Sequence, residues 1–132
     1  MFKENQTAAI ILVVEDEEEI RDAIEKLLES NGYLIEPARD ETEAVLRARR
    51  RHPDLILVSS APPQADLIGS GRRIRRLAEL RMDVPVVIFG SDAVAEGAEL
   101  AIGEHTYLTR PDDFNQLRSY VCHLLHAPSD PE

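Results

Sequence analysis

The chain has 132 residues, 43% hydrophobic and 30% charged, which are proportions typical of one globular domain. Its single cysteine, Cys122, excludes an intramolecular disulfide and a cluster of thiolate metal ligands. The net charge of −10 argues against direct nucleic-acid binding, and no apolar run approaches the roughly 20 residues of a membrane span or forms the core of a signal peptide, so we expect a cytoplasmic protein.

Strand and helix patterns alternate along the chain. Short apolar runs predict strands, in chain order, over residues 8–14, 33–38, 54–59, 84–89 and 105–109. Apolar side chains at helical spacing predict helices over residues 20–28, 40–52, 64–80, 91–102 and 111–126. Ser91 is a candidate N-cap for the fourth helix, whereas Gly69 and Gly71 would loosen the start of the third.

This alternation predicts a three-layer α/β/α domain, in which helices cover both faces of a parallel sheet. We expect residues 9–126 to form the domain, with an N-terminal extension over residues 1–8 and a flexible tail over residues 127–132. The carboxyl ends of parallel strands meet at one edge of such a sheet, where ligands usually bind. The side chains that end the strands are therefore the candidate functional residues.

Five motifs carry a resemblance to a known family. The segments ILVVEDEEEIR, NGYLIEPARDETEAV, PDLILVSSAPP, VPVVIFGS and YLTRPDD resemble, in order and spacing, the receiver domain of bacterial response regulators. The resemblance implies a flavodoxin-like (CheY-like) fold, with a five-stranded parallel sheet in the order 2-1-3-4-5 and five helices. It also implies a signalling module of two-component phosphorelay systems and not an enzyme.

Four residues match the motifs of this family. A typical receiver accepts a phosphoryl group from a histidine kinase onto an aspartate, beside an acidic pair that holds Mg²⁺. By the resemblance, Glu15 and Asp16 correspond to that acidic pair. Tyr107 corresponds to the aromatic residue that changes rotamer on activation, and Pro111 to a proline whose preceding peptide bond is often cis.

Three other positions depart from the family. Ser59 stands where the acceptor aspartate is expected, Gly90 where a Thr or Ser is expected, and Arg110 where a lysine is expected. A serine hydroxyl is a poor nucleophile unless a base removes its proton, so we expect no aspartyl phosphorylation. We also expect weak Mg²⁺ binding, or none, by Glu15 and Asp16, and no other cofactor, because the third carboxylate ligand is missing.

Arg110 offers a way to hold the pocket together without a metal. A guanidinium is always charged and matches the geometry of carboxylates. We hypothesise that Arg110 pairs with Glu15 or Asp16, the alternative being that it extends into solvent. Two other functions stay open: phosphorylation of Ser59 or Ser60 by a serine kinase, and a pseudo-receiver that binds a small ligand in the emptied pocket.

The expected mode of action is protein–protein contact. The resemblance implies a surface made by the fourth helix, the fifth strand and the fifth helix, and a histidine kinase, an output protein or a second copy in a homodimer as the partner. Residues 47–81 carry nine arginines, which form either a basic partner surface or ordinary solvated helix faces. Cys122, His123 and His126 form either part of a metal site or, as is commoner, a buried thiol with histidines at a helix end.

Overall fold

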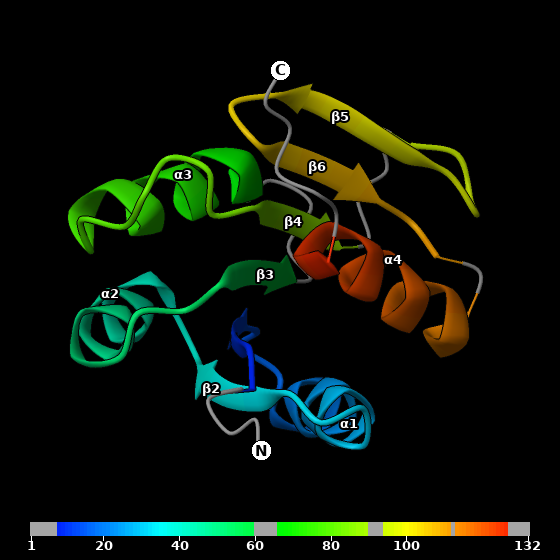
Figure 1. Cartoon of the computed structure of the whole chain (residues 1–132), viewed down its shortest axis with the longest axis horizontal. Helices are drawn as coiled ribbons and strands as arrows, with labels where there is room; N and C mark the ends of the chain where they lie inside the picture. The colour runs from blue at the N-terminus through cyan, green and yellow to red at the C-terminus, as the bar shows by residue number, and fades with distance from the viewer. Residues whose placement is uncertain (1–7, 60–65, 90–93, 112, 127–132) are drawn as a thin grey trace, which may run out of the picture.

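The computed structural model describes residues 8–59, 66–89, 94–111 and 113–126 of the chain (Figure 1). Its strands are β1 (Ile10–Val14), β2 (Leu34–Ala38), β3 (Leu55–Ser59), β4 (Val86–Phe89), β5 (Glu99–Gly103) and β6 (Thr106–Thr109). Its helices are α1 (Glu18–Glu29), α2 (Glu41–Arg50), α3 (Leu67–Leu77) and α4 (Phe114–His126). The strands form one sheet in the order β2-β1-β3-β4-β6-β5.

Helices cover both faces of this sheet, so the expected three-layer α/β/α arrangement is confirmed. Figure 1 shows α2 and α3 on one side and α1 and α4 on the other. Alternate residues of β1 enter the two cores: Leu12 packs with Ile56 and Ile74, whereas Ile11 packs with Leu28 and Leu117. Strands buried on both faces appear in a sequence as continuous apolar runs, which is why β1 and β3 were predictable.

The counts of five strands and five helices are wrong for the described residues, which form six strands and four helices. No helix is present over the described part of residues 91–102, where β5 runs antiparallel to β6. Glu104 and His105 join the two strands, and their positive φ angles of 54° and 51° match a type I′ hairpin turn. The candidate cap Ser91 lies outside the described residues, as do residues 1–7 and 127–132.

The third helix also begins differently from the prediction. Helix α3 starts at Leu67 and contains both glycines, and the Asp66 side chain caps it by accepting the Gly69 amide at 2.9 Å. A Cβ at Gly71 would collide with Cγ1 of Val86 on β4. The glycine therefore lets α3 lie close to the sheet, and this contact compensates for its low helix propensity.

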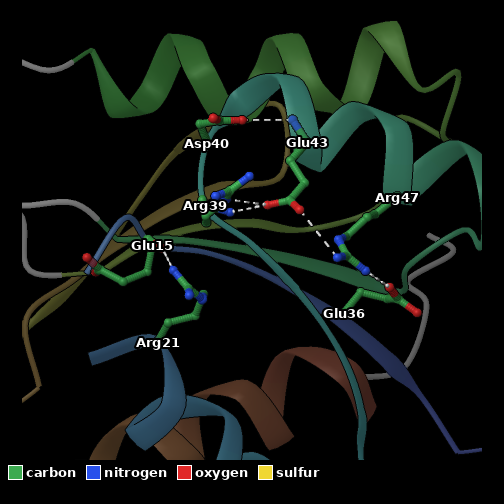
Figure 2. A network of polar contacts seen from close by, with 7 residues as sticks. All are labelled: Glu15, Arg21, Glu36, Arg39, Asp40, Glu43 and Arg47. Atoms are coloured by element: carbon green, nitrogen blue, oxygen red, sulfur yellow. Dashed lines mark hydrogen bonds and ion pairs between the residues drawn. The ribbon is translucent and has the colours of Figure 1, made fainter. Parts of the chain in front are cut away.

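The N-terminus of α2 is fixed by a reciprocal cap (Figure 2). Asp40 accepts the Glu43 amide at 2.8 Å, while the Glu43 carboxylate accepts the Arg39 amide at 2.7 Å. Arg47 then bridges Glu43 to Glu36 of β2. These contacts fasten α2 to β2, the strand that precedes it. None of the helices in the described ranges has the length and hydropathy that a membrane crossing requires.

Candidate functional site

The candidate site lies at the carboxyl ends of β1 and β3. Val14 and Val58 are register partners near the ends of these strands, so Glu15 and Ser59 lie side by side just beyond them. A hollow of about 310 Å³ opens here, between the strand ends and the first turns of α2 and α3. Its lining includes Glu15, Asp16 and Ser59, which the sequence predicted to lie together.

Glu15 is a buried carboxylate with a structural role. It is 1% exposed, and its Oε2 accepts the Glu17 amide at 3.0 Å, where α1 begins. Its backbone carbonyl accepts a hydrogen bond from Arg21 at 2.8 Å, as Figure 2 shows. Burial raises the pKa of the Glu15 carboxyl, and the nearby Ser59 hydroxyl and the Glu17 amide only partly offset this effect. Glu15 therefore stabilises the start of α1 at a cost in desolvation.

Ser59 ends β3 as a small, buried side chain. It is 7% exposed, and its register partner on β4 is Phe89. Carboxylates such as Glu15 and Asp16 line the same hollow, but the end of β3 itself offers a hydroxyl in place of a carboxylate nucleophile. Ser60, which follows it, lies outside the described residues.

The donor set of this pocket does not fit the magnesium site of a receiver. Mg²⁺ requires near-octahedral oxygen ligands. Glu15 directs one carboxylate oxygen to the Glu17 amide, and Asp16 lies exposed beside it. The described residues contain no group of three or more acidic, His or Cys side chains that could hold a metal ion. His123 and His126 are exposed near the exposed Cys122, so the expectation of a buried thiol is wrong.

The pairing expected of Arg110 is wrong. In the described structure no ion pair joins its guanidinium to Glu15 or Asp16; instead Nη1 lies 3.5 Å from the Val94 carbonyl oxygen. The backbone explains why the side chain points this way. Arg110 follows β6, and its amide donates a hydrogen bond to the Ala98 carbonyl oxygen at 3.1 Å. These contacts hold Arg110 against the chain that leads into β5, on the β4–β6 side of the sheet.

Three predicted residues remain, namely Tyr107, Pro111 and Gly90. Tyr107 packs edge-on against Tyr120 of α4, with ring centroids 6.3 Å apart. The expected cis bond before Pro111 is not present, since the described chain contains no cis peptide bond. Gly90 lies outside the described residues.

An ionic contact in the lining of the hollow was not predicted from the sequence. Arg73 of α3 donates to both carboxylate oxygens of Glu41 on α2, at 2.7 and 2.9 Å. The Ser70 hydroxyl donates to the same carboxylate at 3.0 Å. Glu41 is distant in the sequence from Ser70 and Arg73, and it meets them only because α2 and α3 pack side by side, so no local motif could have predicted this contact.

In the basic segment, residues 47–81, polar contacts hold most of the arginines in place. Most of its arginines contact a carboxylate or carbonyl oxygen in the described structure: Arg47, Arg49, Arg51, Arg72, Arg73, Arg75 and Arg81. Only Arg50 and Arg76 have no such contact among the described residues. This distribution supports solvated and paired helix faces over a basic partner surface.

Comparison with known proteins decides the family. The family model described as the response regulator receiver domain matches residues 11–122. The chain belongs to the response regulator receiver family. Receiver domains of this family are signalling modules that interact with histidine kinases and output domains and commonly bind Mg²⁺.

Relatives and solved structures agree with this assignment. The chain is 30% identical to Response regulator MprA of Mycobacterium sp. (strain KMS) over 92% of its length and 53% of the relative's. It thus spans about half the length of the curated relatives it matches. The receiver domain of sensor histidine kinase PA1611 from Pseudomonas aeruginosa PAO1, crystallised with magnesium in its active site cleft, is 26% identical, covers 92% of this chain and 100% of its own, and has a TM-score of 0.67.

The chemotaxis protein CheY4 of Vibrio cholerae shares the fold at 22% identity. The similarity has a TM-score of 0.71 and covers 89% of this chain and 99% of the other. The expected CheY-like fold class is therefore confirmed.

Proposed function

We propose that this chain is a degenerate receiver domain, which acts in two-component signalling by protein–protein contact and without aspartyl phosphorylation. Ser59 is the residue that carries this proposal. It stands at the carboxyl end of β3, where the family resemblance places the acceptor aspartate. An alcohol at this position cannot form the acyl phosphate of a receiver, because that product requires a carboxylate nucleophile.

The conformational switch of the family is also altered. The resemblance assigns the switch to a hydroxyl at position 90 and an aromatic side chain at position 107. Position 90 is glycine and offers no hydroxyl, while Tyr107 already packs against Tyr120. A ligand shifts a conformational equilibrium only through different affinities for the two states. We therefore propose that the domain rests in one conformation that its partner recognises.

The partner would be a histidine kinase, an output protein or a second copy of the chain. The surface expected from the family includes the helix predicted over residues 91–102, and the described part of that segment contains β5 instead. We therefore propose β5, β6 and α4 as the corresponding surface. We place this activity in the cytoplasm, where an exposed free thiol such as Cys122 stays reduced.

A small-ligand pseudo-receiver is the second candidate, because the hollow beside Ser59 has a volume of about 310 Å³. Its lining carries the charged residues Glu15, Asp16, Arg39, Asp40, Glu41, Asp66 and Arg73. Phosphorylation of Ser59 by a serine kinase is disfavoured, since its side chain is only 7% exposed.

The proposal is tested by the response of the amide spectrum to a phosphodonor. A ¹H–¹⁵N correlation spectrum of the chain is recorded before and after addition of acetyl phosphate with Mg²⁺. We expect no change in the amide signals of β3, β6 and α4. Slow appearance of a second set of signals in these elements would show that the domain still switches, and would overturn the proposal.

A further inference from the structure

Within the described residues, strand β5 has one edge with no strand paired to it. It ends the sheet and pairs only with β6 among the described strands. The Arg110 amide donates to the Ala98 carbonyl, so Ala98 points its backbone toward β6, and Leu100 follows the same alternation opposite Leu108. In an antiparallel ladder the intervening residues point the other way. The N–H and C=O groups of Glu99 and Ala101 therefore face outward.

An exposed leucine lies between these outward groups. Leu100 is 48% exposed, although it lies in a sheet strand. Its neighbours on the same face, Ala98 and Ile102, pack against the core under α2 and α3. The free edge thus combines unpaired backbone groups with an apolar side chain, which are the features that natural sheet edges usually avoid.

We propose that β5 pairs antiparallel with β5 of a second copy of this chain, around a two-fold axis at Leu100. In this register Glu99 lies opposite the partner's Ala101, and the outward N–H and C=O groups of both residues all find partners. Leu100 packs against the partner's Leu100 on the axis. The two sheets then join into one continuous sheet through an isologous interface.

The charges of the strand favour this pairing over others. In the antiparallel register Glu99 faces an alanine, whereas in-register parallel pairing would place the two Glu99 carboxylates opposite each other. The other sheet edge is β2, where Pro37 has no N–H to donate. The self-complementary edge is therefore that of β5.

The interface is short, because the ladder of β5 is irregular between Ala101 and Gly103. A pairing confined to a few residues buries little surface, so we expect a weak dimer that forms reversibly with concentration. The inference deepens the proposed function by naming a second copy as the partner. It does not depend on the chemistry at Ser59, so the two can fail separately.

Two substitutions test the interface. Ala101→Pro removes an outward N–H without removing a bond to β6, and Leu100→Glu places like charges at the axis. Leu34→Glu is the matched control, because Leu34 lies in the other edge strand and is 42% exposed. Self-association is measured by sedimentation equilibrium from about 10 μM to about 1 mM protein, a range that covers weak dimers.

We expect the wild type and Leu34→Glu to dimerise with similar affinity, and each interface variant to associate at least about tenfold more weakly. Thermal melting verifies that every variant is folded. Hydrogen exchange of the Glu99 and Ala101 amides should slow in the wild type as protein concentration rises. A wild type that stays monomeric at the highest concentration overturns the proposal. So does a dimer that both interface variants retain, or one that the Leu34→Glu control also loses.

Discussion

The Glu15 carboxylate accepts the backbone amide of Glu17 at 3.0 Å. This bond turns an acidic residue of the receiver motif toward the start of α1. Glu15 lies almost fully buried beside Ser59, where the family resemblance expects a second carboxylate and a metal. The hydrogen bond to Glu17 thus gives it a structural part at the start of α1.

Replacing Glu15 with Gln should change how stability depends on pH. Because burial raises the pKa of Glu15 above its usual 4.5, the folded state disfavours the ionised form. Relative to Glu15→Gln, the wild type should therefore lose free energy of unfolding as pH rises from the unfolded pKa of 4.5 through the higher folded pKa. Urea unfolding from about pH 4 to about pH 8 measures the difference. A gap between the variant and the wild type that stays constant with pH would contradict this assignment.

The contact between Glu41 and Arg73 should show the opposite pH dependence. The hydrogen bonds from Arg73 are the main reason that the pKa of Glu41 is lowered, so the contact contributes stability above the unfolded value of 4.5 and loses it as pH falls through the folded pKa. A double-mutant cycle of Glu41→Gln and Arg73→Gln should give a coupling energy at neutral pH that vanishes in acid. Arg50→Gln, whose guanidinium contacts no carboxylate among the described residues, provides the control partner. Equal coupling of Glu41 to Arg50 and to Arg73 would refute the assignment.

The β5–β6 turn can be tested at His105. Its φ angle of 51° is unfavourable for a side-chain-bearing residue and easy for glycine. His105→Gly should therefore raise the free energy of unfolding by about 1 kcal/mol, since relief of left-handed strain is worth that much. His123→Gly, in the exposed part of α4, should instead lower it by about 1 kcal/mol. Destabilisation by both substitutions would argue against the hairpin.

Gly71 should tolerate no larger residue. Alanine favours a helix by about 1 kcal/mol over glycine, but overpacking a tight contact costs about 1–3 kcal/mol. The Cβ of Gly71→Ala would collide with Val86, so we expect a net loss of about 1 kcal/mol or more in chemical denaturation. Val86→Ala removes the colliding methyl group, and the double variant should regain the helix benefit relative to Val86→Ala alone. A stabilising Gly71→Ala single variant would show that α3 lies further from β4.

The sequence was sufficient to predict the sheet where strands are buried on both faces. Residues 55–59 appear as an apolar run because each side chain enters one of two cores. Residues 99–103 lie at an edge, where burial imposes no such pattern, and their Ala, Glu and Leu residues favour a helix locally. The hairpin turn is also made by Glu104 and His105, which lack the usual Asn-Gly signal.

The site was predictable only where strand ends determine it. Glu15 and Ser59 meet because β1 and β3 are neighbours in the sheet, a consequence of the fold class. The direction of Arg110 depends on its backbone bonds to Gly97 and Ala98, which belong to the unexpected approach to β5. A long side chain takes its direction from such tertiary contacts, so its partner could not be inferred from its position in a motif.

The most direct test of the central claim is the intact mass of the chain after incubation with acetyl phosphate and Mg²⁺. With Ser59 at the acceptor position, the mass should remain that of the unmodified chain. The Ser59→Asp variant provides the matched control, because it restores a carboxylate nucleophile at the same strand end. A wild-type chain that gains the mass of one phosphoryl group, and loses it with hydroxylamine as an acyl phosphate does, would contradict the claim that this receiver has lost its phosphoryl acceptor.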